Sequence, residues 1–135
     1  MKFGRSNLIT GSVVIIIATL GAFALGATLD PNFQEGFYKQ SHNRLLMRAG
    51  HTHGMLFAYF NLIVALLVNK LALGDKGKKW LSILAIGAFL TPLGVFTRGL
   101  LGGTEALMPV VAIGAICYLG CAGLILKGAL GLKTE

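Results

Sequence analysis

Four long runs of apolar residues, separated by polar stretches, dominate the pattern of this chain. They predict helices over 8–29, 50–73, 80–96 and 106–126. Each has the length of a helix that crosses the hydrocarbon core of a bilayer, about 17 to 25 residues. The pattern therefore predicts an all-α fold, an integral membrane four-helix transmembrane bundle that forms a single domain over 1–135.

Prolines and small residues refine this prediction. Pro92 is expected to kink the third span, because proline removes one backbone hydrogen bond. Pro109 falls in the first turn of the fourth span, where proline is tolerated. The polar triplet at 30–32 is expected to end the first span. Small residues at four-residue spacing in that span allow close helix approach. They are Ala18, Ala22 and Gly26.

Composition excludes an ordinary soluble domain. Hydrophobic residues make up 55% of the chain, charged residues only 13%, and the mean hydropathy is +0.75. The net charge of +7 is carried by residues between the apolar runs, which favours topology and anionic headgroups over nucleic acid. Eight lysines and arginines flank one side of the predicted bundle and four the other. Both termini are therefore expected to be cytoplasmic, in a bacterial-type inner membrane.

Candidate chemistry gathers at the other side, the predicted outer end. The long outer loop 30–49 and the start of the second span carry all three histidines, His42, His51 and His53. Three arginines belong to the same end; they are Arg44, Arg48 and Arg98. Ionisable residues at membrane depth are costly and usually have a partner or a role. This clustering predicts a site.

Helical geometry separates the two close histidines, because residues two apart point in opposite directions. His51 continues into a small and polar line that is expected to face the bundle interior: Gly54, Ala58, Asn61 and Ala65. His53 continues into a bulky line that is expected to face lipid, another subunit or the edge of a planar ligand: Phe57, Phe60 and Val64.

Three interpretations of these histidines remain open. They could cap the helix and bond to loop carbonyls at the interface. A neutral imidazole could instead be an axial ligand of haem, with Arg44, Arg48 or Arg98 paired to the propionates. Imidazoles of His51, His53 and His42 could also bind copper or zinc. For Cu(I), a thioether could come from Met55 or Met108.

The segment 48–56, Arg-Ala-Gly-His-Thr-His-Gly-Met-Leu, resembles the start of the second helix in the catalytic subunit of haem-copper oxidases. It also resembles small four-helix bacterial membrane proteins with a His-x-His motif at this point. The resemblance covers about twenty residues and implies haem ligation, best matched by His53 and next by His51. It departs from the oxidases because the third and fourth spans contain no histidine.

These observations predict a haem- or metal-binding accessory membrane subunit of a respiratory or oxidoreductase-type complex, with haem b or copper as the cofactor. The chain does not complete an active site on its own. Lipid and other membrane subunits, or further copies of this chain, are the expected partners. The alternative is a structural membrane subunit without a cofactor, which packs against partner helices and docks a partner or lipid through its basic outer loop.

Three further side-chain predictions concern packing. Asn61 is expected to make an interhelical hydrogen bond in mid-span. Arg98 and Glu105 are expected to form an ion pair across the short third loop. Cys117 and Cys121, four residues apart on one helix, are poorly placed for a disulfide and are expected to pack as free thiols.

Overall fold

The computed structural model describes residues 2–34 and 42–132, with the backbone alone for 24–34. Within these ranges it is helical and contains no strand. The elements are α1 (Arg5–Gln34), α2 (His42–Leu67), α3 (Asp75–Gly87), α4 (Leu90–Leu100), the short 3-10 helix η1 (Glu105–Leu107) and α5 (Met108–Leu130). Four stretches are long and apolar enough to cross a membrane, with α3 and α4 counting as one. The predicted all-α arrangement with four such helices is confirmed.

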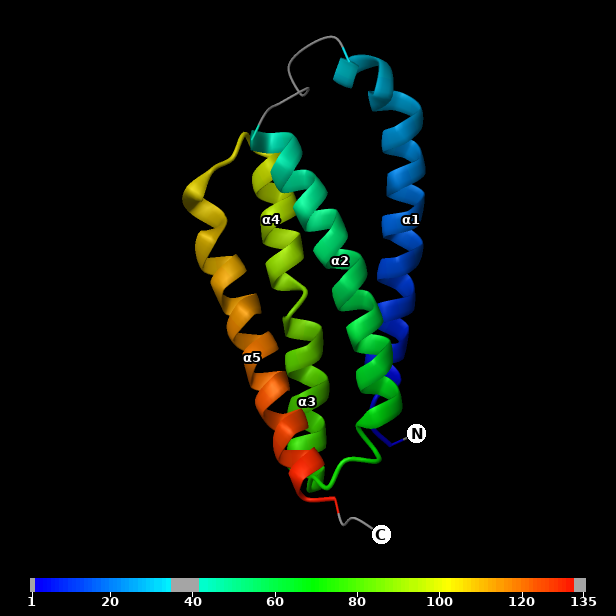
Figure 1. Ribbon diagram of the computed structural model, residues 1–135, viewed down its shortest axis with the longest axis vertical. Coiled ribbons are helices and arrows are strands. Elements are labelled where there is room, and N and C mark those ends of the chain that lie inside the picture. Colours follow the sequence, from blue (N-terminus) through cyan, green and yellow to red (C-terminus); the bar gives the residue numbers. More distant parts are fainter. Residues whose placement is uncertain (1, 35–41, 133–135) are drawn as a thin grey trace.

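We call the four stretches of spanning length rods. They lie side by side, and α3 and α4 are stacked end to end within one rod (Figure 1). Both described ends of the chain lie at the same end of the bundle (Figure 1). There Lys2 forms an ion pair with Asp75, and the amide of Ala72 donates to the carbonyl of Gly128 at 3.2 Å. We call this the Lys-rich end; its other lysines on and beside the turn after α2 are Lys70, Lys76, Lys78 and Lys79.

Pro92 explains why the third rod is divided. In a continuous helix the amide at position 92 would donate to the carbonyl of Ala88, but proline has no amide hydrogen. The Ala88 carbonyl instead accepts from Thr91 at 3.1 Å, and helical bonding resumes with Leu93 donating to Phe89 at 3.1 Å. The kink predicted for Pro92 is confirmed. It lies one turn before the proline itself.

The apolar core lies in the half of the bundle near the Lys-rich end, where α2, α3 and α5 meet. Its buried members are Val64, Val68, Leu71, Leu81, Ala85 and Cys121. The thiol of Cys121 lies 3.7 Å from the carbonyl oxygen of Leu81, and Cys117 packs beside Gly87. Both cysteines are free thiols, as predicted. Small residues at these positions let the helix axes come close.

A buried pair of amides joins three helices beside this core. Asn61 donates to the carbonyls of Ala85 on α3, at 2.9 Å, and of Phe57 on its own helix, at 3.0 Å. The amide of Asn7 on α1 donates to Asn61 Oδ1 at 2.8 Å and to the Ser82 carbonyl at 3.0 Å. The interhelical bond predicted for Asn61 is confirmed, and Asn7 is the partner that the sequence did not reveal.

The helix boundaries differ from the prediction around the first connection. The helix α1 continues through Pro31 to Gln34, and α2 begins at His42 instead of Gly50. Arg44 and Arg48, expected in a loop, are therefore helical. Proline had suggested a stop, and charged residues had suggested a loop. Four-residue spacing of the two arginines fits a polar side of a helix equally well. The rest of the predicted loop, including Lys39, lies outside the described residues.

The closest approach of α1 to α2 also lies elsewhere than expected. A Cβ on Gly11 would lie 2.8 Å from the Ala58 carbonyl oxygen, and one on Gly4 2.7 Å from that of Ala65. Ala22, from the predicted small-residue ladder, is exposed, although it faces the same way as Gly11. The two helices lie together near the N-terminus and separate toward their other ends (Figure 1). This divergence leaves the ladder uncovered at Ala22.

Candidate functional site

The helix α2 carries five of the six candidate residues, so its orientation decides which of them meet. Its buried residues are Gly50, Phe57, Ala58, Asn61, Val64 and Ala65. At 100° per residue these cover an arc of about 120° centred on Asn61. On the same wheel His51 and His53 lie about 80° to either side of Asn61. The two imidazoles thus lie on opposite edges of the buried arc and do not share one site.

This arrangement corrects the lines predicted for α2. Phe57 and Val64, expected to face lipid, another subunit or the edge of a planar ligand, are 7% and 1% exposed and lie inside the bundle. Phe57 and Phe60 both meet the edge of Tyr118 on α5, with ring centroids 5.0 and 5.2 Å apart. The buried arc is wide because α2 contacts α1 on one side, α3 and α4 at the centre and α5 on the other. The small and polar line remains inside, but His51 itself is only half-buried.

His51 belongs to the side of α2 that faces α1. That side is identified by Leu62, which lies beside Gly11 of α1. Four further residues fall within about 60° of one another around this direction, at one-turn intervals toward the start of α2. They are Met55, His51, Arg48 and Arg44. We call Arg44, Arg48 and His51 the basic stripe. Arg48 is exposed, and His51 and Arg44 are half-buried.

His53 lies alone on the other side, one turn from Phe57 and toward α5. Its side chain is exposed, and its Nδ1 lies 2.7 Å from the carbonyl oxygen of Ala49. A carbonyl oxygen only accepts hydrogen bonds, so Nδ1 carries the proton of this contact. In the neutral ring the second nitrogen, Nε2, then keeps its lone pair. The contact therefore fixes the tautomer in which Nε2 is the free ligand atom.

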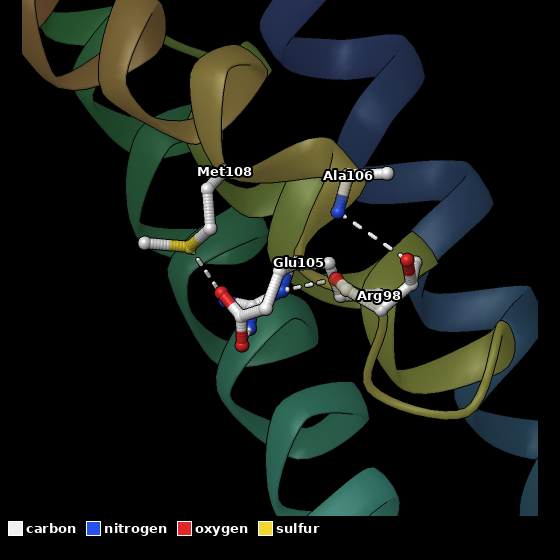
Figure 2. A network of polar contacts seen from close by, with 5 residues as sticks. Arg98, Glu105, Ala106 and Met108 are labelled. Carbon is white, nitrogen blue, oxygen red and sulfur yellow. Dashed lines mark hydrogen bonds and ion pairs between the residues drawn. The ribbon is translucent and has the colours of Figure 1, made fainter.

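Arg98 does not join either histidine, because it is engaged in the loop that follows α4 (Figure 2). Its guanidinium donates to the Thr104 carbonyl at 2.9 Å, to the sulfur of Met108 at 2.8 Å and to Glu105 at 2.8 Å. The predicted Arg98–Glu105 ion pair is confirmed. It is asymmetric, since the arginine side chain is 10% exposed and that of Glu105 79%. These contacts hold the start of α5 against the end of α4.

His42 and the methionines occupy separate positions. His42 is exposed and lies near Gly103 of the same loop, whose φ of +83° suits a glycine. Met108 already accepts from Arg98, and Met55 lies beyond His51 on the side facing α1. Among residues 2–23 and 42–132, whose side chains are described, no three histidine, cysteine, aspartate or glutamate side chains come together as a metal site. In the described residues the three imidazoles thus lie at three separate positions.

The structure therefore divides the six candidates into three groups. The basic stripe lies on the side of α2 toward α1, His53 lies on the side toward α5, and Arg98 and His42 lie beside the loop before α5. Arg44 and Arg48 lie roughly 140° or more around α2 from His53. They do not share a surface with its imidazole. Comparisons with protein-family models, with curated proteins and with solved structures give no match.

Proposed function

We propose that this chain is an accessory membrane subunit of a respiratory or oxidoreductase-type complex, and that His53 binds haem b or copper. Four apolar helices of spanning length support its place in a bilayer. Both described ends lie at the Lys-rich end (Figure 1). Lysine-rich connections favour the cytoplasmic side, so we place both termini there, in a bacterial-type inner membrane.

One observation carries the proposal, the hydrogen bond from His53 Nδ1 to the Ala49 carbonyl at 2.7 Å. Metal-ligating histidines generally donate their other ring nitrogen to a carbonyl or carboxylate, which fixes the tautomer and the ring orientation. His53 has this arrangement and is exposed, so Nε2 is accessible from outside the bundle. The resemblance of segment 48–56 to a haem-binding helix also points to His53.

The position of His53 implies a second chain. One imidazole per molecule provides one axial ligand, and the later helices contain no histidine. A second ligand would come from a partner subunit or from another copy of this chain across the exposed α2–α5 side. The protein would then hold a cofactor between two chains. The second chain would supply the groups that the reaction needs and that this chain lacks.

A haem titration tests the proposal directly. Purified full-length protein in neutral detergent is mixed with haemin and, separately, with Cu(I), and binding is followed by the Soret band and by metal content. We expect a saturable Soret shift or stoichiometric copper with the wild type, and its loss in His53→Ala. His51→Ala is the matched control, because it removes an imidazole two residues away on the other side of α2 and should leave the signal intact.

Two results would contradict cofactor binding by His53. The first is a wild-type protein with neither a Soret shift nor stoichiometric copper. The second is equal binding by the wild type and His53→Ala. A signal lost only in His51→Ala would move the ligand to the basic stripe.

A structural subunit without a cofactor is the second candidate. The observation that favours it is the apolar face of α1 turned away from α2, where Ile17, Leu20 and Phe23 are 63%, 64% and 74% exposed. Such a surface would suit a partner helix. Normal complex assembly and activity with the double variant His51→Ala, His53→Ala would support this candidate and exclude the first.

A further inference from the structure

The basic stripe lies where α1 withdraws from α2. The residues of α1 that face α2 fall on one stripe within about 80° of one another, and their burial changes along the helix. Asn7 and Gly11 are buried, Ala18 is half-buried and Ala22 is exposed. A Cβ added to Gly21 would meet nothing within 4 Å. The side of α2 opposite this uncovered part carries His51, Arg48 and Arg44.

Arg48 has no ion pair with a carboxylate among the described side chains. Within 2–23 and 42–132, where side chains are described, the acidic residues are Asp75 and Glu105. Asp75 lies at the Lys-rich end and pairs with Lys2, while Glu105 pairs with Arg98. Arg48 is exposed on the stripe. Arg44 is engaged in an interaction of its own, so Arg48 and His51 are the two members of the stripe that we consider for a ligand.

An occupant of this region has to match two properties at once. Toward the start of α2 it meets a guanidinium and an imidazole, which suit a phosphate group: arginine binds phosphate with two parallel hydrogen bonds, and an imidazole N–H can donate a third. At the level of Arg48 it also meets the small exposed side chain of Ala22 on α1, and one turn beyond His51 toward the middle of the bundle it meets the apolar Met55. A soluble anion matches only the first property, and an apolar helix only the second.

We propose that this side of α2 binds the headgroup phosphate of an anionic phospholipid, with the acyl chains against the uncovered part of α1. Arg48 and His51 contact the phosphate. The chains occupy the space that α1 leaves as it diverges from α2. The proposal shares with the proposed function only the location in a bilayer, since His53 lies on the opposite side of α2.

Native mass spectrometry tests whether this side of α2 binds an anionic phospholipid. Full-length protein in neutral detergent is given equal amounts of phosphatidylglycerol and phosphatidylcholine with identical acyl chains, and the retained lipid is counted. We expect the wild type to prefer phosphatidylglycerol, and Arg48→Gln to lower that preference about tenfold, the effect of one charged hydrogen bond. Lys79→Gln is the matched control. It removes the same charge from an exposed helical residue at the Lys-rich end and should leave the preference within about twofold of wild type.

Three further arms keep the result decisive. Arg48→Lys should retain part of the preference, because it keeps the charge but loses the planar two-bond contact. His51→Gln should lower the preference less than Arg48→Gln does, because a neutral hydrogen bond is weaker than a charged one. Inorganic phosphate should not displace the lipid, since it lacks the acyl chains.

Four outcomes would overturn the proposal. One is equal retention of the two lipids by the wild type, and another is an equal loss of preference in Arg48→Gln and Lys79→Gln. The third is displacement of the lipid by inorganic phosphate, which would identify a soluble anion as the occupant. The fourth is a lipid-free dimer that Ala22→Phe disrupts, which would assign the surface to a second copy. None of these depends on His53, so the result is separable from the haem and copper titrations.

Discussion

Both α1 and α4 pack against α2, but they do so along different parts of it. The contact with α4 runs from Gly99, beside Met47, through Gly50, beside Phe96, to Gly54, beside Pro92. The contact with α1 is tight at Gly4 and Gly11 and is absent at Ala22, which is exposed. The side of α2 that contacts α4 is therefore the side that serves packing at this end of the bundle. The side toward α1 packs tightly near the Lys-rich end, and beyond this contact Arg48 is exposed and His51 is half-buried.

The two contacts should respond differently when a leucine replaces a glycine in each of them. In Gly50→Leu the new Cβ would lie 2.5 Å from the backbone nitrogen of Phe96, and backbone cannot yield easily. We expect the free energy of unfolding to fall by about 3 kcal/mol or more. In Gly21→Leu the side chain enters open space, and we expect a change below about 1 kcal/mol. Reversible unfolding in mixed micelles, followed by circular dichroism, measures both; equal losses would contradict the comparison.

The buried amides test how α1 is held at the Lys-rich end. Asn61→Leu removes the acceptor of the Asn7 amide and the bond to Ala85, and we expect a loss of about 2 kcal/mol. Asn7→Leu should lose less, because Asn61 keeps its bonds to Phe57 and Ala85. The double variant should lose less than the sum of the two single losses, by about 0.6 to 1.7 kcal/mol. Strictly additive losses in the same unfolding assay would show that the amides act separately.

The loop before α5 offers a comparison within one ion pair. Arg98→Gln removes contacts to Thr104, Met108 and Glu105 from a side chain that is 10% exposed, and we expect a loss of about 1 to 2 kcal/mol. Glu105→Gln changes a partner that is 79% exposed, and we expect about 0 to 1 kcal/mol. Thermal unfolding of both variants checks the order; a larger loss for Glu105→Gln would contradict it.

The smallest expected effect has the opposite sign. The hydroxyl of Ser82 is buried and has no hydrogen-bond partner among the described residues. Removing it in Ser82→Ala takes away a polar group without breaking a bond, so we expect no loss or a gain of up to about 1 kcal/mol in the free energy of unfolding. A measured loss above that size would show that the hydroxyl is satisfied, for example by a water bridging to the unpartnered Asn7 Oδ1.

The sequence predicted the features that depend on local chemistry. Apolar length identified the four spans, the missing amide of Pro92 located the division of the third, and charge identified Arg98 with Glu105. The predicted start of α2 was wrong because Arg44 and Arg48 fit either a loop or the polar side of a helix. The role of Asn7 was missed because a single amide side chain near the end of the chain is also typical of the membrane–water interface. Its role needs the position of Asn61, which only the packing of three helices determines.

The division of α2 into sides could not be derived from its own sequence. A hydrophobic line such as Phe57 and Val64 is compatible with lipid or with a neighbouring helix, and the choice depends on how many neighbours surround α2. Three neighbouring rods widen the buried arc to about 120°, which places His51 and His53 at its two edges. The His-x-His motif was recognisable in the sequence. The assignment of its two histidines to separate surfaces required the packing of the whole bundle.

The contacts of α1 also set an order of events during synthesis. The amide of Asn7 finds its partners 54 and 75 positions later in the chain, at Asn61 and Ser82. Because translation begins at the N-terminus, α1 is complete while neither partner exists. The helix α1 thus reaches its final place only after α2 and α3 have been made, and until then the Asn7 amide has to be satisfied by water or by a chaperoning surface.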